Sequence, residues 1–305
     1  MPYPAIPPPV PDTRPPLEPV YGDPYADGQA ALRGLLLDPA SRRMRLMRMA
    51  WYGIQRVREQ DEPRAGLHGV WAGEELLGAL QIPVTVRISA RTAANAHRLL
   101  AALTAAWAPS SVDLPLLYRM DGTTYLRWVR PRLVDVDTSR LGAGESLVRL
   151  GCVATDPAYY SADLVTEETQ LPAPGGGVTP PLTPPLVLPP RPGGGRISAT
   201  NHGTWDTAPV ITMRGPWTDP GVSYSDGRRV QYQLTLAAGQ ALTVDTATGV
   251  ASLAGGALRS PMPGSTVAAR MLLPPGATTI RMLGTTPVDA TMRPTLTVAW
   301  RHAYL

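Results

Sequence analysis

Turn-forming residues interrupt the last third of the sequence about every ten positions, and this spacing constrains the fold more than any other feature. From residue 196 onward the turn signals are APV, SDGRR, AAGQ, TATG, AGG and PPGA. Segments this short fit strands better than helices. The pattern predicts an antiparallel β-sandwich over 197–305, with strands at 195–200, 208–215, 229–237, 240–246, 248–254, 264–273, 278–284 and 294–303. Within it, 230–255 is predicted to be a three-stranded meander.

The preceding segment, 26–165, is predicted to be a second domain, rich in β-structure and holding one helix. Asp121-Gly122 lies between two alternating runs and predicts a hairpin, because both central positions of a type I′ turn need positive φ. Predicted strands lie at 43–50, 51–58, 66–72, 81–90, 115–120, 124–134 and 146–155.

The single helix is predicted in the run TAANAHRLLAALTAAW. Ser89 or Thr92 can cap its start, and Pro109 closes it. Its apolar side chains recur at helical spacing and define one face: Ala96, Leu99, Leu100, Leu103 and Trp107.

Two segments are rich in proline. Residues 1–25 are predicted to form an irregular or polyproline-II arm. Residues 166–196 include PAPGGGVTPPLTPPLVLPPRPGGGR, which is compatible with a flexible linker, a proline-rich ligand or an ordered connector between the two domains. The chain has 35 prolines and 29 glycines, well above ordinary use, yet 44% of its residues are hydrophobic, so we expect a folded protein.

All 28 basic residues are arginine, and the formal net charge is +4. The densest group lies in RRMRLMRMAWYGIQRVR, where the alternation of arginine with apolar residues predicts a strand with one solvent-exposed face. A solvated or interface-facing strand explains this pattern better than a nucleic-acid patch, which would need more charge focused on one face. Arginine and tryptophan are residue types that anchor interfaces. The interface candidates are Arg43, Arg45, Arg48, Trp51 and Arg56.

Residues that carry catalysis or hold metals form no recognisable pattern. The four histidines are scattered, and the sequence contains no phosphate-binding loop, dinucleotide-binding glycine motif or nucleophile elbow. Adjacent acids such as Glu74-Glu75 are best explained as solvated pairs, and Cys152 as a buried thiol. We therefore expect a non-enzyme without metal or cofactor, made in a reducing cytoplasm, with no secretory signal and no membrane insertion.

Two tryptophans beside predicted turns, Trp205 and Trp217, are candidates for exposed contacts with a carbohydrate or a partner protein. Trp300, in an alternating run, is most simply a core residue. A host-surface carbohydrate-binding module that acts through the C-terminal sandwich is therefore an alternative function.

Motifs in the C-terminal half carry a resemblance to a known family. NHGTWDTAPVITMRGPWTDPGV, GQALTVDTATGVASLAG, LLPPGATTIRM and TLTVAWRHAYL occur in this order. They resemble the distal tail proteins of long, non-contractile phage tails, in particular minor tail proteins of phages that infect actinobacteria. The N-terminal half agrees more loosely. The matching positions are turn and core residues: Asn201, Gly203, Pro209, Gly215, Pro216, Gly239, Leu242, Asp245, Thr246, Pro275, Gly276, Trp300 and Arg301.

This resemblance implies a structural virion protein. The N-terminal domain would form a ring, usually of six copies, and the C-terminal domain would be a galectin-like sandwich. The ring would join the tail tube protein to the hub or tip protein, would carry receptor-binding or other tail-tip proteins, and would let the genome DNA pass without specific binding. The implied location is the tail tip of a virion assembled in the host cytoplasm. The family has an extended repeat where 166–196 lies, which favours an ordered connector with the two glycine triplets as hinges.

Overall fold

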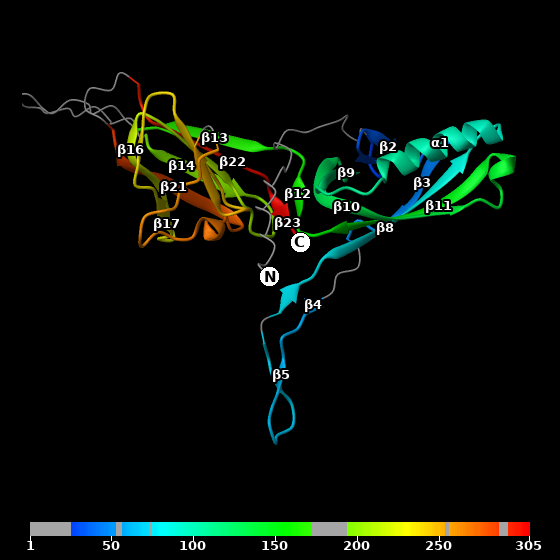
Figure 1. The fold of residues 1–305 in the computed structure, drawn as a ribbon, viewed down its shortest axis with the longest axis horizontal. Coiled ribbons are helices and arrows are strands. Elements are labelled where there is room, and N and C mark those ends of the chain that lie inside the picture. The colour runs from blue at the N-terminus through cyan, green and yellow to red at the C-terminus, as the bar shows by residue number, and fades with distance from the viewer. Residues whose placement is uncertain (1–25, 53–56, 74, 172–193, 254–255, 287–291) are drawn as a thin grey trace, which may run out of the picture. The chain divides into compact units, whose positions relative to one another are not determined.

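The computed structural model describes residues 26–52, 57–73, 75–171, 194–253, 256–286 and 292–305 (Figure 1). The chain divides into two compact units, Met1–Asp163 and Leu164–Tyr304. The predicted arm (1–25), most of the predicted connector and Arg56 lie outside the described residues, so those predictions stay predictions.

One antiparallel sheet organises the N-terminal unit. Its strand order is β2-β1-β9-β10-β11-β8-β3, and β12 also pairs with β10. The bounds are β1 (Ala30–Leu32), β2 (Leu35–Leu37), β3 (Met44–Met49), β8 (Leu80–Ser89), β9 (Leu114–Met120), β10 (Thr123–Asp137), β11 (Glu145–Ala154) and β12 (Tyr159–Ser161). A 3-10 turn, η1 (Leu141–Ala143), separates β10 from β11.

The predicted helix is confirmed as α1 (Ala93–Ala106). Of the two proposed caps the structure uses Thr92, whose Oγ1 accepts a hydrogen bond from the backbone N–H of Asn95 at 3.3 Å. The predicted hairpin is confirmed as well, with φ of 50° at Asp121 and 74° at Gly122. Along β8 and β11 alternate residues are buried, so this sheet has one covered face and one open face.

Between β3 and β8 the chain forms a long hairpin extension that leaves the sheet (Figure 1). Its two short ladders are β4 (Val57–Arg58) with β7 (Leu76–Leu77), and β5 (Glu62–Pro63) with β6 (Val70–Trp71). The strands predicted at 51–58 and 66–72 were therefore too long. Almost every described side chain from 57 to 73 is exposed, and strands without a face to bury stay short.

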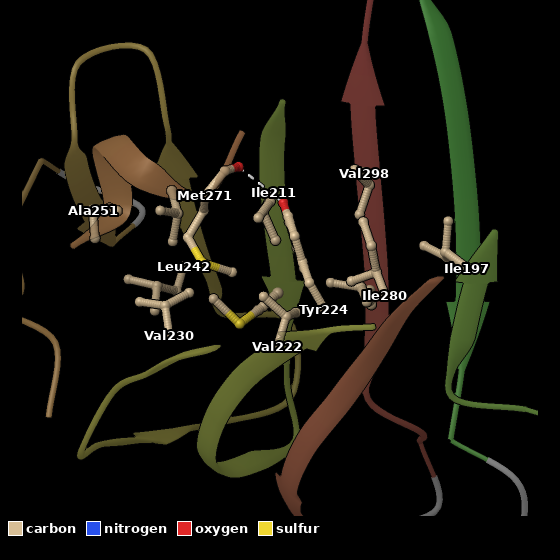
Figure 2. Close-up of a cluster of buried hydrophobic side chains, with 14 of the residues drawn as sticks. Ile197, Ile211, Val222, Tyr224, Val230, Leu242, Ala251, Met271, Ile280 and Val298 are labelled. Carbon is tan, nitrogen blue, oxygen red and sulfur yellow. Dashed lines mark hydrogen bonds between the residues drawn. The ribbon is translucent and has the colours of Figure 1, made fainter. Parts of the chain in front are cut away.

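Two five-stranded antiparallel sheets form the C-terminal unit, in the orders β13-β22-β15-β19-β20 and β14-β21-β16-β17, with β18 also on β16. The predicted sandwich is confirmed, because apolar side chains from both sheets meet in one core (Figure 2). The bounds are β13 (Val165–Gln170), β14 (Arg196–Asn201), β15 (Val210–Arg214), β16 (Trp217–Tyr224), β17 (Arg229–Gln231), β18 (Thr235–Leu236), β19 (Ala241–Asp245), β20 (Val250–Leu253), β21 (Gly276–Thr285), β22 (Thr295–Trp300) and β23 (Ala303–Tyr304).

Several predictions inside the sandwich were wrong. The meander is split, because β17 and β18 join one sheet whereas β19 and β20 pair in the other. Instead of a strand, 264–273 contains a 3-10 turn, η2 (Ala268–Arg270). Residues 166–170, predicted as connector, lie in β13 and pair with β22. The structure also has an unpredicted strand, β16, in which a register shift between Thr218 and Gly221 accommodates the intervening proline.

Asn201 shows why the residues that matched the family pattern are structural. Its side chain is buried, donates to the carbonyl oxygens of Trp205 (2.7 Å) and Leu273 (3.2 Å), and accepts from the Gly203 N–H (3.0 Å). A Cβ on Gly203 would lie 1.7 Å from the carbonyl oxygen of Ala303, so no other residue fits there. The motif therefore closes a turn against the end of the chain.

Candidate functional site

The open face of the strands β10, β11, β8 and β3 carries the main concentration of charge in the N-terminal unit. Two rows of paired residues cross these four strands. The first row is Asp137, Leu147, Arg87 and Arg45, and the second is Asp135, Arg149, Thr85 and Arg48. Since the intervening residues of β8 and β11 are buried, both rows lie on the open face, which we call the charged face.

The β3 end of the charged face is basic. Arg43, Arg45 and Arg48 are all exposed, as predicted for a wet strand, and none of them forms a salt bridge with a described residue. A cleft of about 820 Å³ adjoins this end between β3 and the start of α1, and four of its lining residues are arginines: Arg42, Arg43, Arg91 and Arg98.

A second cleft, of about 450 Å³, is also lined by Arg42, and its lining includes Arg45 and Arg87. The residues lining these two clefts include no carboxylate. The first turn of α1 holds no acidic residue either, although a helix start favours negative charge. Of the arginines that line the two clefts, Arg87 forms a salt bridge with Glu145 at 3.2 Å, and the others form none with a described residue. This end of the face is therefore only partly neutralised within the described part of the chain.

The opposite end of the charged face, the second half of β10, carries two aspartates, Asp135 and Asp137, together with the exposed Arg132 and exposed apolar side chains. Asp135 pairs with Arg149 at 3.2 Å, yet its side chain remains 55% exposed. Hydrogen bonds from Ser139 hold the pKa of Asp137 below its usual range, so this carboxylate is charged. Beside them, Leu133 and Val134 are exposed although they lie in a strand. From Leu133 to Asp137, β10 pairs with β11 along one edge, and no described strand pairs with its other edge.

Sequence reasoning missed this acidic end. Asp135 and Asp137 were not among the predicted interface candidates, and the strand was predicted to stop at 134. The sequence carries no clear signal for it, because Leu133 and Val134 place apolar side chains on both faces of the strand, which is typical of a strand covered on both faces. In this chain both side chains are exposed instead.

The prediction that Trp51 lies at an interface is wrong, because its side chain is only 3% exposed. Its ring stacks on Tyr118 with centroids 5.2 Å apart, and its carbonyl oxygen accepts a hydrogen bond from Nη1 of Arg127 at 3.1 Å. The Arg127 guanidinium, itself buried, lies 5.1 Å from the ring centroids of both Trp51 and Tyr159. Burial lowers the pKa of Arg127 to about 10. Trp51 thus anchors the base of the extension in the core.

The extension itself exposes apolar side chains. Leu67, Val70 and Trp71 are 72%, 47% and 62% exposed, and Arg64 lies over the Trp71 ring at 4.4 Å. Exposed large apolar residues grouped on one element are typical of contact surfaces.

In the sandwich the two candidate tryptophans differ. Trp217 is completely buried, and its Nε1 donates to the carbonyl oxygen of Leu283 at 2.8 Å, so the predicted exposed contact there is wrong. Trp205 is 42% exposed and lies near His202 and His302, whose rings contact each other edge to face. Trp300 is a core residue, as predicted.

Within the described ranges, no group of three or more His, Cys, Asp or Glu side chains could hold a metal ion. Cys152 is buried, as predicted, and burial raises the pKa of its thiol to about 12, which keeps it protonated and unreactive. No described helix is long and apolar enough to cross a membrane.

The fold of this chain is similar to that of a solved phage protein. The solved structure that shows this is the Dit (gp 19.1) protein of phage SPP1, described as a paradigm of the hub adsorption apparatus in phages that infect Gram-positive bacteria. The two chains are 14% identical with a TM-score of 0.59, over 91% of this chain and 99% of SPP1 Dit.

Two structures of the phage p2 baseplate in its activated conformation, with Ca and with Sr, are also similar, each at 10% identity. Their TM-scores are 0.47 and 0.49, over 89% and 90% of this chain and 97% and 98% of theirs. Neither a protein-family model nor a curated protein sequence matches the chain.

Proposed function

We propose that this chain is a structural protein of a long, non-contractile phage tail, located at its distal end. In this role it forms a ring, of six copies, that joins the tail tube protein to the hub or tip protein. The observation that carries the proposal is the likeness to SPP1 Dit, which extends over both units and almost the whole of that chain. Fold alone does not specify function, so the charged face and its two ends are the second support.

A ring requires two different surfaces on one protein that fit each other on neighbouring copies. The four-stranded part of the sheet offers two such surfaces, because β3 and the second half of β10 lie at its opposite ends. Six copies would contribute twenty-four strands, and even at the spacing of hydrogen-bonded strands, about 4.8 Å, these form a wall at least about 37 Å across. Closed sheets of about 16–18 strands already leave an aqueous channel, so this ring would have a lumen.

The remaining surfaces suit partners in the tail. The extension presents Leu67, Val70 and Trp71, and it buries little within its own chain. In the proposed role such a surface contacts another subunit or a tail-tip protein such as a receptor-binding protein. Genome DNA passes through the lumen without specific binding, and the ring has no catalytic role.

The test is the assembly state of the purified chain. We expect closed rings with a central hole in negative-stain electron microscopy, and a mass of six copies by mass photometry. Purified tail tube protein should bind one face of the ring and raise the yield of closed rings. A chain that stays monomeric both alone at high concentration and with tube protein present would contradict the proposal.

The structure gives less support to the carbohydrate-binding alternative than the sequence did. It relied on two exposed tryptophans, and Trp217 belongs to the core. Of the two, only Trp205 is exposed, and it lines neither of the two clefts described above, whereas small-molecule sites are typically concave.

A further inference from the structure

We infer that opposite charge at the two ends of the charged face determines how neighbouring copies meet: the β3 arginines of one copy face the β10 aspartates of the next. This inference rests on the proposed ring and names the residues that close it. Each of the two rows across the sheet begins with an aspartate in β10 and ends with an arginine in β3, namely Asp137 with Arg45 and Asp135 with Arg48.

Strand direction favours this contact. The four strands alternate in direction, so β3 runs opposite to β10. Rotation about a ring axis leaves the direction of every β10 unchanged. The β3 of one copy therefore meets the next β10 in antiparallel orientation, which continues the alternation already present within the sheet.

Side-chain chemistry favours it as well. Opposite charges across neighbouring strands are stabilising, and like charges are destabilising. Arg45 and Arg48 form no salt bridge with a described residue, although Asp38 is the β-bridge partner of Arg45 at the outer edge of β3. Both aspartates are exposed. Beside the charges, the exposed Met47 of β3 and the exposed Leu133 of β10 provide apolar surface that a neighbour would cover.

The backbone of β3 limits the kind of contact. The loop before β3 already occupies part of its outer edge, because the Leu46 N–H donates to the carbonyl oxygen of Asp38 at 3.1 Å and the Met44 N–H to Oγ of Ser41 at 3.2 Å. A full backbone ladder along β3 is therefore not available. The side chains of the charged face must carry the contact, which makes it sensitive to charge.

Charge reversal at each end tests the inference. One variant carries Arg45→Asp and Arg48→Asp, so that both of its ends are acidic, and the other carries Asp135→Arg and Asp137→Arg, so that both are basic. Each variant alone should assemble at least about tenfold more weakly than the parent. An equimolar mixture should restore rings, because each acidic end then meets a basic one. Such rings alternate the two variants and hold an even number of copies.

The matched control reverses an exposed arginine pair in the sandwich, Arg196→Asp and Arg281→Asp, which are cross-strand neighbours on β14 and β21. We expect this control to assemble like the parent. Circular dichroism and thermal unfolding verify that each variant is folded. Variants that assemble alone like the parent, or that fail to assemble when mixed, would overturn the inference, even where the parent forms rings and the proposed function stands.

Disulfide cross-linking detects the contact between two copies even when rings do not close. Full-length Arg48→Cys and Asp135→Cys variants are mixed and oxidised, and the buried Cys152 serves as an internal unreactive thiol. We expect a disulfide-linked heterodimer in the mixture and several-fold less dimer in either variant alone. A mixture that yields no more dimer than the single variants would overturn the inference, whether or not the parent closes into rings.

Discussion

Two buried tyrosines in the sandwich core have different environments. Tyr224 donates its hydroxyl to the carbonyl oxygen of Met271 at 3.0 Å (Figure 2), whereas the Tyr232 hydroxyl has no hydrogen-bond partner among the described residues. Burial raises the pKa of Tyr232 to about 12, and burial also raises that of Tyr224. An unpaired buried hydroxyl costs free energy that a phenyl ring does not.

Replacing Tyr232 with Phe should leave the free energy of unfolding unchanged or raise it by about 1 kcal/mol. The pKa of Tyr232 is higher in the folded than in the unfolded chain. Its contribution to stability is therefore complete below about pH 10 and is lost as the pH rises towards about 12. Urea unfolding at about pH 8 and about pH 11 measures the free energy of unfolding at each pH. This free energy should fall less between the two pH values for Tyr232→Phe than for the parent.

The matched control is Tyr224→Phe, which leaves the Met271 carbonyl oxygen without its partner and should cost about 1–2 kcal/mol at neutral pH. Equal destabilisation by both substitutions would show that the Tyr232 hydroxyl has a partner after all.

At the scale of elements, the extension differs from the strands on either side of it. β3 and β8 bury alternate side chains, whereas β4, β5 and β6 bury none. The stability of a strand comes mainly from the face that it buries. The extension therefore adds little to the stability of its own unit, and its conformation serves contacts outside it.

Replacing 61–72 with a short glycine-containing turn should change the thermal unfolding midpoint by no more than a few degrees, because the deleted side chains leave no cavity. Calorimetry measures this. A matched core substitution, Val84→Ala in β8, should lower the midpoint clearly more. A large destabilisation by the shortened extension would contradict the view that it is dispensable for folding.

At the scale of the whole molecule, the charge distribution matters more than the net charge of +4. A basic β3 end and an acidic β10 end on one sheet make the N-terminal unit electrically polar along the direction in which a ring would grow. Contacts between such exposed charges are screened by salt, with a Debye length of about 10 Å at 0.1 M and about 3 Å at 1 M.

Raising the salt concentration from about 0.1 M to about 1 M should therefore shift rings towards smaller species. Mass photometry follows this shift, and the Arg196→Asp and Arg281→Asp control should respond like the parent. Rings that persist unchanged or grow in high salt would indicate a mainly apolar contact, centred on Met47 and Leu133.

Local chemistry allowed much of the fold to be predicted. The Asp121-Gly122 turn and the Thr92 cap depend on neighbours a few positions away, and the alternating pattern of β8 is visible within ten residues. The predicted arginine-rich wet strand depends on the same kind of local pattern, so half of the candidate site was visible from the sequence.

The other half was decided only by tertiary structure. Trp51 and Trp217 were both predicted to make contacts outside the chain, but whether a ring is buried depends on segments far away, such as Arg127 for Trp51 and Leu283 for Trp217. The sheet that each sandwich strand joins, and the row that sets Asp135 level with Arg48, likewise depend on pairing across many residues. A sequence by itself determines which face of a strand is apolar, but which faces are covered, and which charges end up opposite each other, is decided by long-range packing.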